Sequence, residues 1–299
     1  MARILLTGSE GLIGRSLRRG LEAEGHRVVC FDVRGEGAAH GDVRDPVVLA
    51  RAISGCAGVV HLAAVSRVAE AEASPLVCRA TNVGGLANVL AAAAAQPGRP
   101  WVVAASSREI YGNPEKLPAD ENSPARPINR YAESKVAGER LVSEAASAGL
   151  RAMTVRLSNV YGDPADYPDR VVPAFALAAA RGGTLQVCGP DHILDFTHID
   201  DVVRGLVRLV EVFGEGGVEV PTLHFVTGCG TALAELAAMA VSMGGHRCRI
   251  VEAPPSGLHV GHFIGCGVQA RAHLGWEPAI RIEEGLRRLM NAYASGQAA

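Results

Sequence analysis

The chain has 299 residues, of which 48% are hydrophobic and 20% are charged. This composition excludes a disordered chain, and the length suits one large α/β unit or two closely packed lobes. The formal net charge is −2, from 29 basic and 31 acidic residues, so no basic excess exists for binding nucleic acid or an anionic membrane.

The sequence carries no membrane or secretion signal that we recognise. No uninterrupted apolar run reaches the roughly 18 residues that a membrane-spanning helix needs. The first residues run directly into a glycine turn, which does not suit a signal peptide. The seven cysteines are odd in number and form no CxxC pair, which indicates reduced thiols. We therefore expect a cytoplasmic protein.

Strands and helices alternate over the first 160 residues. Apolar runs predict strands at 2–7, 27–31, 58–62, 101–105 and 152–157. Helical spacing predicts helices at 12–24, 46–54, 76–95 and 131–148, and the proline-rich stretch 113–130 is a predicted loop. This alternation predicts an α/β fold with a doubly wound parallel sheet of the Rossmann type.

The second half of the chain is less regular. It predicts helices at 171–181, 200–213, 231–242 and 282–294, and strands at 185–187 and 223–226. We interpret residues 1–167 as a dinucleotide-binding domain whose sheet is completed by about 197–226. Residues 168–196 and 227–299 are then a smaller, interleaved substrate-binding lobe.

A glycine-rich turn follows the first strand and opens the first helix. Its glycines stand at GxxGxxG spacing. Gly8 permits the tight turn, Gly11 lets the backbone approach a pyrophosphate, and Gly14 lets the helix pack on the strand. The helix begins with Leu12 and Ile13, and its unpaired N–H groups face the phosphates. The turn therefore predicts a dinucleotide site.

Further cofactor contacts are expected at the ends of the next strands. Asp32 can accept both ribose hydroxyls and would repel a 2′-phosphate, which favours NAD over NADP. Asp42 and Val43 either lie near the adenine or form a turn. The strand at 58–62 ends in a structural His61 and in small or apolar residues that allow close approach to the cofactor, namely Leu62, Ala63 and Ala64.

Tyr131 and Lys135 share one face of a predicted helix, because they are four residues apart. A phenol with a pKa near ~10 is a poor base at neutral pH, and a nearby ammonium lowers that pKa by about 1–3 units. Lysine can also bind a ribose hydroxyl, and only two lysines occur in the chain. Ser107, after the strand at 101–105, would hold a substrate oxygen against Tyr131.

The chain resembles the extended short-chain dehydrogenase/reductase family, in the NAD-dependent epimerase/dehydratase group that acts mostly on nucleotide sugars. The matching segments cover the whole chain in order. They are Thr7-Gly8-Xaa-Xaa-Gly11-Xaa-Xaa-Gly14, Asp32, Asp42-Val43, His61-Leu62-Ala63-Ala64, Asn82-Val83-Xaa-Gly85, Ser106-Ser107-Xaa-Xaa-Ile110-Tyr111-Gly112, Tyr131-Xaa-Xaa-Xaa-Lys135, Arg156-Leu157-Xaa-Asn159-Val160-Tyr161-Gly162, Asp195-Phe196-Xaa-His198-Ile199-Asp200-Asp201 and Leu274-Gly275-Trp276-Xaa-Pro278.

The resemblance implies roles for these residues. Tyr131 is the acid/base, Lys135 holds the nicotinamide ribose and tunes Tyr131, and Ser107 aligns the sugar hydroxyl. Asn82 supports the cofactor site or the fold alone, and Asn159 contacts the substrate near its diphosphate. The resemblance also implies NAD as cofactor and a homodimer formed through the helix that carries Tyr131 and the long helix before it.

The sequence departs from the family pattern at the substrate site. Leu194 stands where nucleotide-sugar members usually have an arginine, and no arginine lies between Arg249 and Arg271. Two missing phosphate clamps indicate that the substrate is bound differently or is not a nucleotide sugar. The segment His259-Val260-Gly261-His262 lacks further ligands, so no metal is expected.

Glu109 stands where the family's 4,6-dehydratases place a glutamate base, but Arg108 does not match the residue expected before it. An ordinary Glu–Arg pair is the alternative.

The sequence thus predicts an NAD-dependent epimerase, with a nucleotide-sugar 4-epimerase as the main interpretation. The implied reaction takes hydride from a sugar carbon, commonly C4, while Tyr131 takes the hydroxyl proton, and returns hydride to the other face of the keto intermediate. A 4,6-dehydratase, a dehydrogenase of a sugar or sugar acid, and a dinucleotide-binding module without catalysis are the alternatives.

Overall fold

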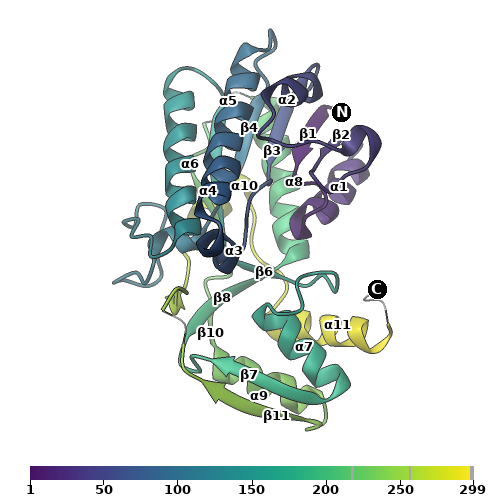
Figure 1. The fold of residues 1–299 in the computed structure, drawn as a ribbon, viewed down its shortest axis with the longest axis vertical. Coiled ribbons are helices and arrows are strands. Elements are labelled where there is room, and N and C mark those ends of the chain that lie inside the picture. The colour runs from purple at the N-terminus through teal and green to yellow at the C-terminus, as the bar shows by residue number, and fades with distance from the viewer. Residues whose placement is uncertain (217–218, 256, 297–299) are drawn as a thin grey trace.

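A six-stranded sheet forms the centre of the larger part of the computed structural model (Figure 1). The structure describes residues 1–216, 219–255 and 257–296. Residues 217–218, within the predicted completion of the sheet, and residues 256 and 297–299, within the predicted substrate lobe, lie outside the described residues.

The sheet is parallel throughout and runs in the order β2-β1-β3-β4-β5-β9, so the predicted fold class is confirmed. Its strands are β1 (Arg3–Thr7), β2 (Arg27–Phe31), β3 (Gly58–His61), β4 (Trp101–Ser107), β5 (Ala152–Leu157) and β9 (Leu223–Phe225). The strand order reverses between β1 and β3, where Thr7 pairs with His61. Ligands of doubly wound sheets bind outside the carboxyl ends of the strands at such a reversal.

Helices cover both faces of this sheet (Figure 1). One face carries α1 (Leu12–Ala23), α8 (Ile199–Glu215) and α10 (Val268–Leu274), and the other carries α2 (Pro46–Ile53), α5 (Gly85–Ala95) and α6 (Arg130–Ser147). The apolar side chains of each strand alternate between the faces: Leu6 lies in the core under α1 and α8, and Leu5 lies in the core under α5.

The predicted helix at 76–95 is interrupted. The structure has α3 (Val68–Ala73), α4 (Pro75–Arg79), the π-helical turn η2 (Ala80–Gly84) and then α5. Among the described residues, Pro75–Ala95 alone is a helical run long and apolar enough for a membrane span, by length and composition only. The core helices of soluble proteins also pass this test, and 39% of the run's apolar stretch is buried inside the protein.

Further strands and helices form a second lobe (Figure 1). One sheet contains β6 (Asn159–Tyr161), β8 (Ile193–His198), β10 (Gly230–Ala232) and β12 (His262–Phe263), and a second contains β7 (Gly183–Cys188) and β11 (Cys248–Ala253). An apolar core that includes Phe175, Leu236 and Leu289 lies among α7 (Val171–Arg181), α9 (Leu233–Met243) and α11 (Ile282–Ala294). Of these strands the sequence predicted only the one at 185–187.

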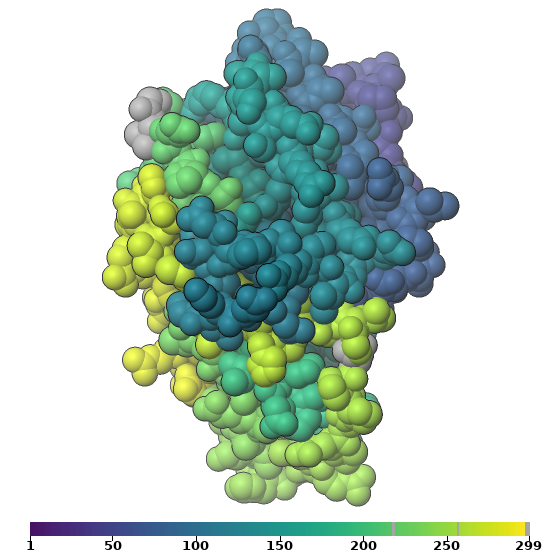
Figure 2. All heavy atoms as spheres, turned by 90° about the vertical axis from the view of Figure 1, so that its left-hand side faces the viewer, coloured from purple at the N-terminus to yellow at the C-terminus, as the bar shows by residue number. Residues whose placement is uncertain are grey.

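The proline-rich loop joins the two parts of the molecule. The loop follows the short helix η3 (Arg108–Tyr111) and leads into α6. Elsewhere in the chain, another short helix, η1 (Gly37–Ala39), follows β2. The Ala119 N–H donates to the Ile264 carbonyl and the Cys266 N–H donates to the Ala119 carbonyl, each at 2.8 Å. Figure 2 shows the dark teal atoms of this loop directly against the yellow-green atoms of the C-terminal segment.

Candidate active site

The glycine turn is built so closely that side chains are excluded. Gly8 has φ +73°, and a Cβ on it would lie 2.6 Å from the Ala63 nitrogen. A Cβ on Gly14 would lie 2.1 Å from the Gly8 carbonyl oxygen. Gly11 precedes α1 as its N-cap and supplies no side chain there, so the N-terminus of the helix is left open for an anion.

The two predicted carboxylates stand differently. Asp32 is buried, and its carboxylate accepts the N–H groups of Glu10 at 3.0 Å and Arg34 at 2.9 Å. These bonds hold the carboxylate beside the glycine turn. Asp42 instead receives the Arg44 N–H at 2.9 Å and the Arg44 guanidinium, which lowers the pKa of Asp42. The turn that the sequence analysis gave as an alternative for Asp42 is therefore present.

The segment after β3 borders the glycine turn and contains Leu62, Ala63 and Ala64, whose side chains are only partly buried. His61 is buried beside it, and its Nδ1 lies 2.8 Å from the Thr7 hydroxyl oxygen. Burial and then the Lys135 charge lower the pKa of His61 to about 3, so this imidazole is neutral. That state fits the structural role expected for His61.

Asn82 joins this segment to α6 from within the π-helical turn. Its amide oxygen accepts the Val65 N–H at 2.8 Å, and its amide nitrogen donates to the Val65 carbonyl at 3.0 Å and to the Ser134 hydroxyl at 2.9 Å. A π-helical turn places one extra residue in the helix and occurs frequently at functional sites. Here the turn aims a buried amide at two elements at once.

Ser107, Tyr131 and Lys135 come together at the carboxyl end of β4. The Lys135 ammonium donates to the Ala105 carbonyl at 2.8 Å and lies 5.7 Å from the centre of the Tyr131 ring. Burial lowers the pKa of Lys135 to about 8. Burial raises the pKa of Tyr131 to about 12, although the Ser107 hydroxyl favours the phenolate. The spacing of Tyr131 and Lys135 predicted a lowered phenol pKa, but in this structure the burial of the ring outweighs the interactions that stabilise the phenolate.

Glu109 is buried in an ion pair. One carboxylate oxygen lies 2.8 Å from Nη2 of Arg108, and the other accepts the Asn129 amide at 2.9 Å. The same Arg108 nitrogen donates to the Asn159 amide oxygen at 3.0 Å. Each oxygen of Glu109 thus has a partner, and Arg108 connects the pair to Asn159 in the second lobe.

The position of the absent arginine is an apolar one. Leu194 is buried in β8 and belongs to the core of the second lobe, and Asn159 lies beside it, donating to the Asp195 carbonyl at 3.0 Å. Asp195 is also buried and accepts the N–H groups of Thr227 and Gly228, each at 2.9 Å. Among the described residues, no group of three His, Cys, Asp or Glu side chains could hold a metal ion, and all seven cysteines are free.

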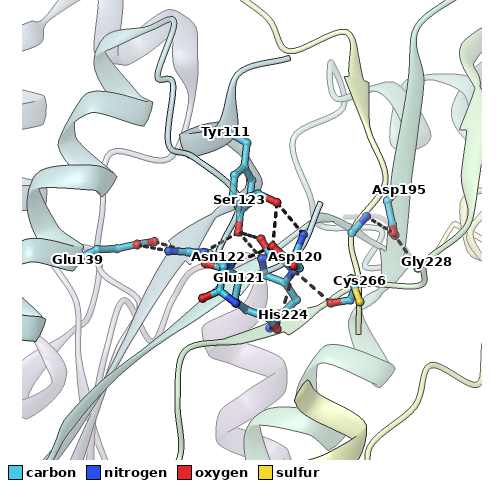
Figure 3. A network of polar contacts seen from close by, with 12 residues as sticks. Tyr111, Asp120, Glu121, Asn122, Ser123, Glu139, Asp195, His224, Gly228 and Cys266 are labelled. Atoms are coloured by element: carbon cyan, nitrogen blue, oxygen red, sulfur yellow. Dashed lines mark hydrogen bonds and ion pairs between the residues drawn. The ribbon is translucent and has the colours of Figure 1, made fainter. Parts of the chain in front are cut away.

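A buried polar network behind Lys135 was not foreseen (Figure 3). The Arg156 guanidinium binds both carboxylate oxygens of Glu139, at 2.9 and 2.7 Å, and donates to the Tyr111 hydroxyl at 2.6 Å. That hydroxyl lies 2.5 Å from Nε2 of His224, and Glu121 accepts the His224 N–H at 3.0 Å. The network ties α6, β5, β9 and the proline-rich loop together.

Sequence reasoning had one signal for this network. Glu139 follows Lys135 by four residues, as Lys135 follows Tyr131, so all three share one face of α6. The partners of Glu139 come from distant segments, and nothing in the sequence pairs them.

Comparisons with known proteins identify similar sequences and similar structures. The sequence model described as the NAD dependent epimerase/dehydratase family matches residues 4–220. UDP-glucose 4-epimerase from Streptomyces lividans is 28% identical, with 93% of this chain and 92% of that protein covered. A UDP-glucose 4-epimerase structure with UDP-glucose, from Thermotoga maritima, has a TM-score of 0.89 at 26% identity and 99% coverage of both chains. The dTDP-glucose 4,6-dehydratase DesIV from Streptomyces venezuelae has a TM-score of 0.86 at 26% identity, covering 99% and 98%.

Proposed function

Because the chain belongs to the NAD dependent epimerase/dehydratase family, as an NAD-dependent enzyme of the extended short-chain dehydrogenase/reductase kind, we propose that it is a nucleotide-sugar 4-epimerase. The observation that carries this proposal is the convergence of Ser107, Tyr131 and Lys135 at the carboxyl end of β4, at the same edge of the sheet as the glycine turn. The 4-epimerases among its relatives support the choice of reaction.

The residues of the glycine turn fit a dinucleotide. Gly8 and Gly14 have no space for a Cβ, so the backbone itself would form the binding surface for the dinucleotide. Gly11 has no side chain, which leaves the N–H groups at the start of α1 free for its phosphates. We propose that Leu12 and Ile13 contact the phosphates, that Asp32 contacts the ribose, and that Asp42 and Val43 lie near the adenine. Leu62, Ala63, Ala64 and Asn82 would line the remainder of the site, and Lys135 would bind the nicotinamide ribose. NAD bound there would accept a hydride from a sugar carbon and return it.

Proton transfer belongs to Tyr131 in this proposal. Ser107 would hold the sugar hydroxyl against the phenol, so that Tyr131 removes the hydroxyl proton during oxidation and returns it during reduction. Lys135 would place its positive charge near the phenolate. Burial raises the pKa of Tyr131 to about 12. A nearby positive charge would therefore be needed to favour the phenolate at neutral pH.

A 4,6-dehydratase is the second candidate, and Glu109 is the observation that favours it. A glutamate base would have to take a proton from the sugar, and both oxygens of Glu109 already have partners in Arg108 and Asn129. We therefore favour epimerisation, in which Glu109 keeps Arg108 in place.

The first test is to denature the freshly purified protein and to quantify released NAD and NADH by chromatography. About one cofactor per chain supports an enzyme that recycles its cofactor, an epimerase or a dehydratase.

The second test is incubation with UDP-glucose and separation of the products. Formation of the C4 epimer supports the proposal, a 4-keto-6-deoxy product supports the dehydratase, and an empty protein that reduces added NAD with a sugar or sugar acid supports a dehydrogenase.

We further propose that residues 1–167, with 197–226, hold the cofactor, and that residues 168–196 and 227–299 bind the sugar. Within the first range, β6 would present Asn159 to the sugar, because it pairs with β8 of the second lobe. We also propose a cytoplasmic homodimer. The exposed side chains of Leu76 and Val77 on α4, which lies beside α6, support an interface there. Sedimentation of Leu76→Asp as a monomer and of the unchanged protein as a dimer tests this interface.

A further inference from the structure

Imidazole and guanidinium side chains from both lobes lie where the second lobe meets η3. His192 directly precedes β8, His262 begins the neighbouring strand β12, and the rings of the two residues are 6.1 Å apart. His259 lies three residues before His262, and Arg108 approaches from η3. His262, His259 and Arg108 are each near enough to lower the pKa of His192 through their positive charge.

The imidazole ring of His192 packs closely against two glycines. A Cβ on Gly189 and a Cβ on Gly261 would each lie 2.8 Å from the imidazole. Gly189 also has φ +73°, which disfavours any side chain at that position. Because neither glycine carries a side chain, the imidazole of His192 can pack against both segments.

The loop from the larger lobe holds the histidine segment in place. The Asn113 side-chain oxygen accepts the N–H groups of Gly261 at 2.8 Å and His262 at 3.1 Å. Asn129 binds Glu109 with the same amide nitrogen that donates to the Leu258 carbonyl at 3.0 Å. Hydrogen bonds from Asn113 and Asn129 in the proline-rich loop therefore connect the histidine segment to the Arg108–Glu109 ion pair.

Arg108 has hydrogen-bonding capacity to spare. Its side chain is 8% exposed, and Nη2 serves both Glu109 and Asn159. Nη1 is buried and has no hydrogen-bond partner. A buried charged N–H without an acceptor is costly, which indicates that this nitrogen binds a group from outside the chain.

We propose that His192, His262 and Arg108 form a receptor for the anionic group of the substrate, in place of arginines on β8 and before α10. This inference rests on the proposed function for the existence of a sugar substrate at this site. The anionic group is an oxyanion, which is either the diphosphate of a nucleotide sugar or the carboxylate of a sugar acid. Leu194 supports it, because an apolar, buried side chain occupies that position of β8.

A receptor made of imidazoles differs from one made of arginines in its pH dependence. Burial, then His262, His259 and Arg108, lower the pKa of His192, and Asp191 acts in the opposite direction. A bound anion would oppose the first four effects and draw a proton onto the imidazole. Affinity for the anion is then linked to proton uptake and falls as the pH rises, whereas a guanidinium stays charged.

The test measures binding by calorimetry in a Tyr131→Phe background, so that no turnover occurs. The probes are UDP-glucose, glucuronate and uridine, because neither the diphosphate diester nor the carboxylate changes its charge between about pH 6 and about pH 8. We expect one of the two anions to bind about tenfold more weakly at the higher pH, and uridine to show no pH dependence. A UDP-glucose response assigns the diphosphate, and a glucuronate response assigns the carboxylate.

Variants identify the receptor. His192→Gln should weaken binding about tenfold at the lower pH and remove the pH dependence. His262→Gln should weaken binding about tenfold at the lower pH, and Arg108→Lys should weaken it equally at both pH values. His273→Gln, on α10, is the matched control, and thermal melting confirms that each variant folds. Unchanged affinity in both histidine variants, or no pH-linked binding of either anion, overturns the inference. Epimerisation does not enter this readout, so the proposed reaction and the receptor fail separately.

Discussion

The carboxylate of Glu139 accepts two hydrogen bonds from Arg156, one turn of α6 beyond Lys135. The two side chains are 17% and 12% exposed, so the pair lies largely away from solvent. Removing one member of such a pair leaves an uncompensated buried charge.

Glu139→Gln should therefore destabilise the protein by about 3 kcal/mol, measured by urea unfolding with an unchanged slope. The double variant Glu139→Leu/Arg156→Met removes both charges and should recover much of that loss. A single variant within about 0.5 kcal/mol of the unchanged protein would show that the pair contributes nothing.

Asp32 should govern the choice of cofactor. We expect the protein to bind NAD at least about tenfold more tightly than NADP, because the buried carboxylate repels a 2′-phosphate. Asp32→Asn should narrow this ratio by weakening NAD binding and admitting NADP. Fluorescence titration of the cofactor-free protein measures both affinities. Glu36→Gln, which removes an exposed carboxylate of the same segment, is the control, and equal affinities in the unchanged protein would contradict the prediction.

Lys135 should set an alkaline limit on activity. Its pKa is lowered to about 8 by burial, so the ammonium loses its proton as the pH rises through that value. In the proposed mechanism this removes the positive charge beside the Tyr131 phenolate, and kcat/KM should fall above about pH 8. Lys135→Arg keeps a charge at every pH, so its profile should lack this decline even if the rate is lower throughout. The same alkaline decline in both proteins would assign it to another group.

Tyr131→Phe tests the acid/base directly. It removes the only proposed proton carrier and should lower kcat by about 10²–10⁴-fold, with little change in the affinity for NAD. Steady-state kinetics and cofactor titration separate the two effects. A variant that keeps a tenth of the activity would remove Tyr131 from the mechanism.

Glu109→Gln separates the two candidate reactions. The amide can still bond to Arg108 through its oxygen, so an epimerase should lose no more than about tenfold in rate. A dehydratase that uses Glu109 as a base should lose elimination by 10²-fold or more. Chromatography of the products distinguishes the outcomes, and elimination of water that persists in this variant excludes Glu109 as the base.

Acid should destabilise the fold through two buried histidines. Burial lowers the pKa of His61 to about 3 and of His224 to about 4, below their ordinary value near 6.5. The unfolded chain therefore binds these protons first, so stability is complete above about pH 6.5 and is lost as the pH falls toward the folded pKa values. Each histidine should cost about 1.4 kcal/mol per pH unit in that window. Urea unfolding between about pH 7 and about pH 4.5 measures the slope, and a flat profile would contradict the prediction.

Local sequence patterns predicted the sheet well because most of its strands are continuous apolar runs between short turns. Gly8, Gly11 and Gly14 form the close turn that their spacing predicted, and Tyr131 and Lys135 lie on one face of α6 as expected. These features depend on neighbours in the sequence, so the sequence alone was sufficient.

The second lobe was predicted poorly because its strands depend on distant partners. β10 and β12 have three and two residues, and each exists through pairing with β8 rather than through its own apolar pattern. The π-helical turn had a similar origin, since Asn82 bonds to Val65 and Ser134 from opposite directions. The buried environment of Glu109 could not be foreseen either, because Asn129 binds it from the start of α6 and Asn159 binds its partner Arg108 from β6.

The bonds from Asn113 and Asn129 to the segment 258–262 have a consequence for engineering. The substrate lobe is not an exchangeable module, although the two lobes have separate cores. A chimera that takes this lobe from a relative with another sugar would bring a segment shaped for a different loop. Its crossover points must therefore carry the donor's counterparts of residues 112–129 together with the lobe, or the exchange will shift Glu109 and Arg108 even though neither residue was replaced.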